Sequence, residues 1–196
     1  MGVDYYVAVH ASDWPTPAAI NRCIGELHYP IAIAGVPAAM DKPLTEAPTI
    51  GGFTVTFEDK AVELEGGVTR LGPDSPYAFT LNPELLKQQE TLPDGTQHFM
   101  ARPTGMQDFV PRDLNADLRE LGVANPDFGD GDYVLSLTFR SDLTPWRAGW
   151  FLMAAMIKCA NGLGFEFGDG SYGRGKYADW LAEKAADPDY WKKAHP

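Results

Sequence analysis

The chain has 196 residues, of which 44% are hydrophobic and 12% aromatic. This length and composition are typical of one globular domain and exclude a disordered or collagen-like chain. The formal net charge is −11, with 5 basic and 13 acidic residues in 1–98, and 11 and 14 in 99–196. Nucleic-acid-binding proteins usually carry a basic face. The acidic balance therefore argues against nucleic acid and favours a protein partner with a basic surface.

The sequence predicts neither a membrane segment nor an export signal. The most apolar stretch, 146–160, is interrupted by Arg147 and Lys158 and is too short to span a bilayer. The first residues have no basic region followed by an apolar one. Cys23 and Cys159 lie far apart in apolar segments, and we expect two free thiols in a reducing compartment. These features predict a cytoplasmic protein that does not associate with membranes.

Residue periodicity predicts three elements in the first 34 residues. A strand is expected over 4–11, where apolar side chains alternate along one face. Thr16-Pro17 then indicates the start of a helix, with Thr as the N-cap and Pro at the first helical position. A short buried strand is expected at 31–34, and a long loop rich in Pro and Ala follows at 35–51.

A hairpin is predicted from residue 53 to residue 65. Two alternating segments, 53–57 and 61–65, flank a polar turn. Alternation in the second segment points Val62 and Leu64 into the core and leaves the intervening acids together on the solvent side. The hairpin therefore predicts an acidic patch that steers a basic partner, made of Glu58, Asp59, Glu63 and Glu65.

The second half has stronger patterns. A helix is expected over 113–121 with Gly122 as its stop, followed by an alternating strand over 132–140. Thr144-Pro145 indicates the start of a long helix that is apolar nearly all round, so we expect it in the core. A short strand at 165–167, a Gly-rich turn and a last helix at 177–186 complete the chain.

The chain contains one internal similarity. Asp4-Tyr5, followed by Thr16-Pro17, recurs 128 residues later as Asp132-Tyr133, followed by Thr144-Pro145. The pattern predicts a duplicated β-α-β unit, with pseudo-repeat halves 1–101 and 102–196. The alternative is coincidence, since strands that lead to Thr-Pro helix starts are common. Either way, we expect a single α+β domain with a mostly antiparallel sheet and helices packed on it.

No catalytic residue, cofactor site or metal site is predicted. The four histidines lack the spacing of a zinc site, and the acidic segment 127–132 lacks that of a calcium loop. The Gly-rich segment 170–177 resembles a phosphate-binding loop, but Tyr177 stands where a Ser or Thr should bind magnesium. We therefore expect a binding protein more than an enzyme.

Three further residues are candidates for binding. Glu166 lies between Phe165 and Phe167, so its side chain should point away from them, either into a pocket or to solvent at a strand edge. In a pocket its pKa would be raised and it would bind a cation. Tyr190 and Trp191, near the C-terminus, either contact a partner or pack back on their own domain.

The segment 130–170 has a familiar pattern. Phe139-Arg140-Ser141-Asp142, an Ala-rich helix and the Gly-rich run 161–167 resemble small bacterial α+β proteins, several of which look like immunity proteins that neutralise toxins. This resemblance implies a non-enzymatic protein that blocks a partner. The alternative is a small-molecule-binding domain that resembles the gyrase-inhibitor-like fold, whose duplicated halves flank a cleft. The candidate pocket residues are then Tyr6, Trp146 and Glu166.

Overall fold

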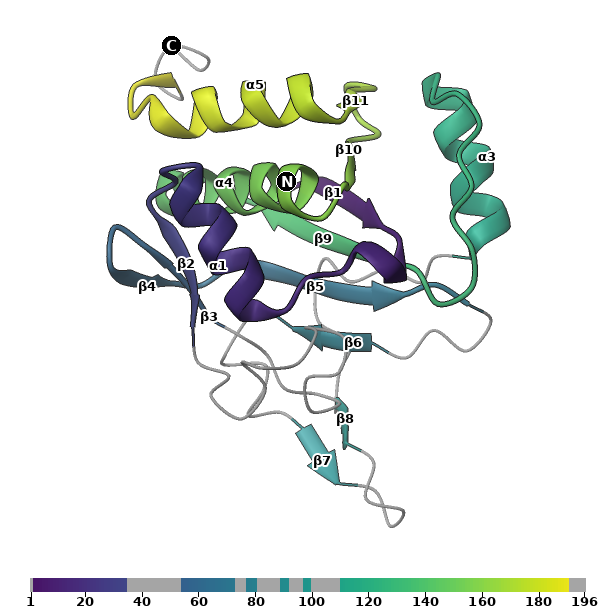
Figure 1. The fold of residues 1–196 in the computed structure, drawn as a ribbon, viewed down its shortest axis with the longest axis horizontal. Coiled ribbons are helices and arrows are strands. Elements are labelled where there is room, and N and C mark those ends of the chain that lie inside the picture. Colours follow the sequence, from purple (N-terminus) through teal and green to yellow (C-terminus); the bar gives the residue numbers. More distant parts are fainter. Residues whose placement is uncertain are drawn as a thin grey trace.

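The structure is a computed structural model that describes residues 2–34, 54–72, 77–80, 89–91, 97–99 and 110–190. The predicted loop 35–51 lies outside these residues. The strands (Figure 1) are β1 (Val3–Val9), β2 (Ile31–Ala34), β3 (Thr54–Phe57), β4 (Lys60–Val62), β5 (Glu65–Arg70), β6 (Tyr77–Thr80), β7 (Gln89–Thr91), β8 (Gln97–Phe99), β9 (Tyr133–Phe139), β10 (Leu163–Phe165) and β11 (Tyr172–Gly173). The helices are the short 3-10 helix η1 (Ala11–Asp13), α1 (Pro17–Glu26), α3 (Pro111–Leu121), α4 (Leu143–Cys159) and α5 (Gly175–Ala186).

The described strands form antiparallel sheets, and the predicted α+β class is confirmed. The main sheet has six strands in the order β11-β10-β1-β9-β5-β6. A three-stranded sheet has the order β2-β3-β4, and β7 pairs with β8. The two strands with the clearest alternation, β1 and β9, are neighbours in the centre of the main sheet and pair along their full length.

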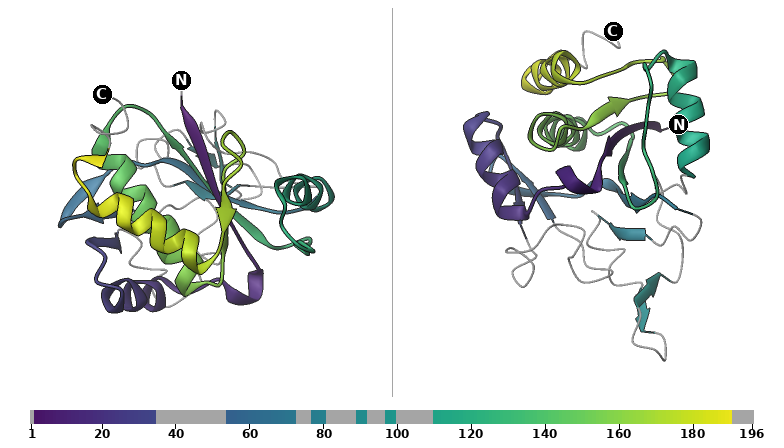
Figure 2. Two further views of the ribbon diagram at one scale, coloured as in Figure 1. Left: turned by 90° about the horizontal axis from the view of Figure 1, so that it is seen from above. Right: turned by 45° about the vertical axis from the view of Figure 1, so that its right-hand side comes forward.

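Side chains of β1 alternate between the two faces of the main sheet, and each face has its own core. Tyr5, Val7 and Val9 belong to the larger core, which contains α4. Tyr6 and Ala8 belong to a smaller core, which contains the buried leucines of α3. Figure 2 (right) shows α4 and α5 on one side of β1 and α3 on the other. The sheet is therefore covered by helices on both faces in this region.

Helix α4 lies in the core, as its composition predicted. Eleven of its 17 residues are buried, because it packs between the main sheet, α1 and α5. Its start differs from the prediction. Asp142 and not Thr144 is the N-cap, since the Asp142 carboxylate accepts the N–H of Thr144 at 3.0 Å. Neither α4 nor any other helix in the described ranges is long and apolar enough to cross a membrane.

The internal duplication is not confirmed. The pairing of β1 with β9 places Val7 opposite Leu135, which agrees with the offset of 128. The strands that follow the two helices differ, however. β10 joins the main sheet beside β1, whereas β2 pairs with β3 in the second sheet. The duplication therefore stays a prediction.

The prediction of two free thiols is wrong. Cys23 of α1 and Cys159, the last residue of α4, form a disulfide with their Cα atoms 6.1 Å apart. They are 136 residues apart in sequence, and their proximity depends on how α1 packs against α4. The reducing compartment was inferred from free thiols, so the predicted cytoplasmic location loses that support.

Candidate functional site

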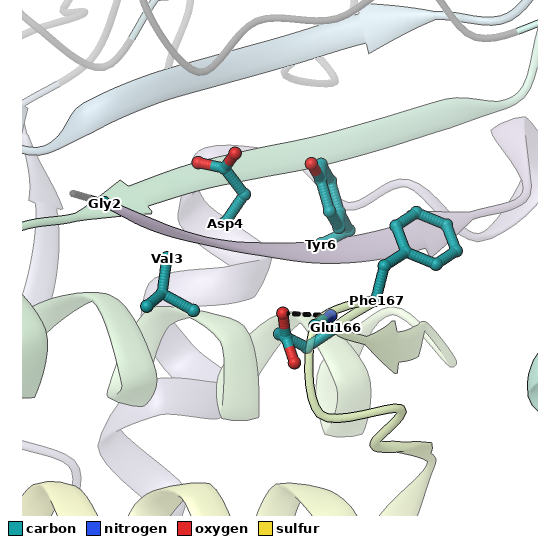
Figure 3. Close-up of a pocket in the computed structure, with 7 residues that line it drawn as sticks. Gly2, Val3, Asp4, Tyr6, Glu166 and Phe167 are labelled. Carbon is teal, nitrogen blue, oxygen red and sulfur yellow. Dashed lines mark hydrogen bonds between the residues drawn. The ribbon is translucent and has the colours of Figure 1, made fainter.

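An open pocket of about 300 Å³ lies where the first residues of β1 meet the turn after β10 (Figure 3). It is lined by Gly2, Val3, Asp4, Tyr6, Glu166, Phe167 and Gly168. Two of these seven residues are acids and none is Lys or Arg. The pocket therefore presents negative charge beside aromatic rings, which favours a cationic ligand.

The pocket exists because β1 is longer than the strand beside it. β9 pairs with all seven residues of β1, whereas β10 pairs only with residues 6–8. The chain leaves β1 after Phe165, at the end of β10. Within the described residues, positions 3–5 consequently have a neighbouring strand on one side only. The pocket lies along this open part of the strand edge.

Glu166 is the buried charge of the pocket, with 5% of its surface exposed. Its Oε1 accepts the N–H of Gly168 and its Oε2 accepts the N–H of Asp169, both at 2.6 Å. Burial raises the pKa of Glu166 above its usual value; the two backbone N–H groups oppose the rise and the Asp169 carboxyl adds to it. Glu166 thus lies in a pocket and not on an exposed edge strand.

A second group of polar side chains lies next to Glu166. Asp169 Oδ1 accepts the N–H of Ser171 at 2.8 Å, and the hydroxyl oxygens of Ser171 and Tyr177 are 3.1 Å apart. Burial raises the pKa of Tyr177 to about 12, despite the lowering effect of its hydrogen bond with Ser171. Burial favours a high pKa for Asp169 too, but hydrogen bonds with Glu166 and Ser171 outweigh it and lower that pKa.

Two neighbouring carboxyls with opposite pKa shifts are an arrangement that can supply an acid and a base. Of this pair, only Glu166 lines the pocket. Both of its oxygens are already hydrogen-bonded to the backbone, which fixes the side chain in place.

The pocket extends around the edge of β1. Figure 3 shows Asp4 and Tyr6 on one side of the strand, and Val3 and Glu166 on the other. Phe167 and Val3 are both 39% exposed, which is high for apolar side chains of this size. The ring of Phe167 lies 5.6 Å from that of Tyr6. An apolar wall thus continues from the strand edge into the turn.

The predicted pocket of Tyr6, Trp146 and Glu166 is only partly assembled. The structure brings Tyr6 and Glu166 together, but Trp146 belongs to the core on the other face of the sheet. There its ring stacks on Phe139 at 4.7 Å, and its indole N–H donates to the carbonyl of Arg140. Asp4 was missed in the sequence, although alternation places it on the same face as Tyr6.

The predicted acidic hairpin forms, but its second strand is β4 (Lys60–Val62) and not 61–65, because the chain enters β5 of the main sheet at Glu65. Glu58 and Asp59 make a two-residue turn between β3 and β4, both in the left-handed region at φ 50° and 62°. Asp59 and Glu63 are exposed and have no ion-pair partner among the described residues. The Glu58 carboxylate is 3.9 Å from the guanidinium of Arg147.

Glu65 does not share the free solvent face predicted for it. Its two oxygens accept hydrogen bonds from Nε and Nη2 of Arg140 at 2.7 and 2.8 Å. The Glu65 side chain is only 23% exposed. This bidentate pair joins the start of β5 to the residue after β9, so Glu65 holds the sheet together and is not free for a partner.

The other predicted contact residues are at the C-terminus. Tyr190 packs back on its own domain, with its ring 5.8 Å from that of Trp150. The ammonium of Lys184 lies 4.6 Å from the centre of the Tyr190 ring. Tyr190 is therefore half-buried by this chain. Trp191 lies outside the described residues.

The acidic segment 127–132 has a structural role. Asp132 accepts from His10 Nδ1 and from the backbone N–H groups of Ala11 and Gly129, each at 2.9 Å. The other ring nitrogen of His10 lies 3.4 Å from Asp127. These contacts tie the end of β1 to the start of β9. In the described ranges, no group of three or more His, Cys, Asp or Glu residues is arranged to hold a metal ion.

Comparisons of the chain with protein families, with curated proteins and with solved structures found no match in any of the three. The function is consequently argued from the geometry and charge of the chain itself. Two features carry that argument: the acids of the β3–β4 hairpin and the pocket at the edge of β1.

Proposed function

We propose that this protein is a binding module for a partner protein with a basic surface. The observation that carries the proposal is the exposure of Asp59 and Glu63 on the hairpin. Glu58, which precedes Asp59 in the turn between β3 and β4, adds a third acid. The net charge of −11 adds a long-range attraction for such a partner. Electrostatic complementarity of this kind mainly accelerates association, while buried anchors set the rate of dissociation.

The narrower proposal is an inhibitor of the immunity type, which acts by covering its target. It is supported by the resemblance of residues 130–170 to such proteins and by the lack of a recognisable catalytic set. A cytoplasmic location belongs to this narrower proposal. The disulfide between Cys23 and Cys159 favours an oxidising compartment instead, so the redox state in the cell is a test of location.

A second candidate function is the binding of a small cationic molecule. One observation favours it: the buried carboxyl of Glu166 and the ring of Tyr6 line the same pocket, from opposite sides of β1. At about 300 Å³ the pocket is at the lower end of the usual range for small-molecule sites, and it is open to solvent. A group that projects from a larger partner fits this shape better than a free ligand that must be enclosed.

The proposal is tested with a partner captured from an extract of the native cell and identified by mass spectrometry. Association is then measured by stopped flow at about 0.01 M and about 1 M salt, where the Debye length is about 30 Å and about 3 Å. The double variant Asp59→Lys/Glu63→Lys should slow association about tenfold at low salt and have little effect at high salt. Glu65 is left unchanged because its loss would break the pair with Arg140.

The matched control is Asp117→Lys/Glu120→Lys, which makes the same change of net charge at two exposed acids of α3. It should slow association much less if the hairpin itself faces the partner. Equal slowing by the two double variants would show that only net charge matters. An unchanged rate in the hairpin variant at low salt would overturn the proposal.

A further inference from the structure

We infer that the pocket at the edge of β1 binds an arginine side chain carried by an extended segment of the partner, which adds as a strand beside residues 3–5. This inference rests on the proposed function, because it supplies the anchor for the same basic partner. The expected occupant is a basic β-strand segment of another protein.

β1 has an open edge at residues 3–5. Residues 3–5 are paired with β9 on one side and have no strand on the other within the described residues. An extended segment of three or four residues, roughly 10–14 Å at about 3.4 Å per residue, matches this length of edge. Main-chain hydrogen bonds then give affinity, and pockets for alternate side chains give specificity. Such an edge next to a pocket is the geometry that strand addition requires.

The pocket is lined by two acidic side chains. Each oxygen of the Glu166 carboxyl accepts one backbone N–H, and the same carboxyl shares a hydrogen bond with the Asp169 carboxyl. A carboxylate has about four lone-pair positions, so one is left for a further donor. Asp4 contributes a second carboxylate, whose Oδ1 accepts the hydroxyl of Thr138 at 2.6 Å. None of the seven described residues that line the pocket is a Lys or Arg that could neutralise these acids. A cation brought in by the partner would supply the missing positive charge.

The aromatic rings in the pocket favour a guanidinium over an ammonium group. The exposed ring of Phe167 lies 5.6 Å from the ring of Tyr6, and the two form an apolar wall of the same pocket. Tyr6 is on the same side of β1 as the Asp4 carboxylate and on the opposite side from Glu166 (Figure 3). A planar guanidinium can stack on an aromatic face while it donates to a carboxylate, whereas an ammonium is a strongly hydrated point charge. Burial also raises the pKa of Glu166, and a bound cation would draw that pKa back down.

The test uses the whole protein and three short peptides as probes. The first is an acetylated and amidated Thr-Val-Arg-Val-Thr, the second has citrulline in place of Arg, and the third carries N-methyl groups that block strand pairing. Binding is followed by amide NMR, with the N–H groups of Gly168 and Asp169 as direct reporters of the Glu166 carboxylate. The Arg peptide should shift these two signals saturably and bind at least tenfold more tightly than either control.

Two variants locate the binding. Glu166→Gln should reduce the affinity for the Arg peptide to that of the citrulline peptide. Because this change could disturb the turn, Phe167→Leu serves as the second variant. It removes the ring at a 39% exposed position and should weaken the Arg peptide several-fold while the unfolding midpoint stays the same. Equal binding of Arg and citrulline peptides, or shifts confined to other regions, would overturn the inference.

Failure of this site and failure of the proposed function give different results. If the captured partner binds Glu166→Gln as tightly as the unchanged protein but is slowed by Asp59→Lys/Glu63→Lys, the pocket is not the anchor and the binding function stands. If the Arg peptide binds the pocket and the hairpin variants leave partner association unchanged, the pocket stands and the steering role is overturned.

Discussion

The segments β1–α1–β2 and β9–α4–β10 share an Asp-Tyr pair near the start of the first strand and a Thr-Pro pair near the start of the helix. The two helices nevertheless occupy different environments. α4 lies between the main sheet and α5 and is buried on nearly all sides. α1 has ten residues and buries one face through Pro17, Ile20 and Ile24. The position of a helix in the layers, and not the motif at its start, therefore determines how much of its surface is buried.

The strands that follow the two helices show the same contrast. β10 is held by pairing with β1 in the main sheet. β2 is an edge strand, and Asn21 of α1 hydrogen-bonds both the N–H and the carbonyl of Ile33 at 2.8 Å. A side chain thus occupies part of the β2 edge, which would otherwise be open to another strand. Similar starting motifs lead to one strand inside a sheet and one at its rim.

The largest effect is expected from the bond that joins the two helices. Reduction of Cys23–Cys159, or the double variant Cys23→Ser/Cys159→Ser, should lower the free energy of unfolding by about 4 kcal/mol, because the bridge closes a long loop. The measurement is urea unfolding with and without a reductant. The urea midpoint of the double variant should not change with the reductant. An unchanged urea midpoint of the natural sequence after reduction would contradict the presence of a stabilising disulfide.

A pair of glycines tests the difference in packing. At Gly149 of α4 an added Cβ would lie 2.4 Å from the buried ring of Phe139, so Gly149→Ala should destabilise by about 1–2 kcal/mol. At Gly25 of α1 nothing lies within 4 Å of the added Cβ, and Gly25→Ala should stabilise by about 0.5 kcal/mol. Thermal unfolding measures both; effects of the same sign would mean that the two helices are packed alike.

The helix caps give the smallest effects and the finest comparison. Thr16 caps α1 by accepting the N–H of Ala19 at 3.1 Å, so Thr16→Ala should cost about 1 kcal/mol. In α4 the cap is Asp142, so Asp142→Ala should cost about as much while Thr144→Ala changes stability by less than about 0.5 kcal/mol. If Thr144→Ala costs as much as Thr16→Ala, the two Thr-Pro motifs have equivalent roles after all.

The sequence by itself determined the local elements. Alternation identified β1, β9 and the β3–β4 hairpin, and the uninterrupted apolar pattern placed α4 in the core. These features depend on residues close together in the chain, since strand and helix periodicity act over a few residues. The α+β class follows from the same local information.

Only the tertiary structure decided which distant residues meet. Cys23 and Cys159 are joined because α1 packs on α4, and Glu65 is neutralised because Arg140 follows the neighbouring strand. The pocket likewise depends on the early end of β10 beside β1, a difference in strand length that no local pattern records. Such contacts are fixed by packing and register between segments that are 75 or more residues apart in the chain. This is why Glu166 could be suspected from its neighbours while its site could not.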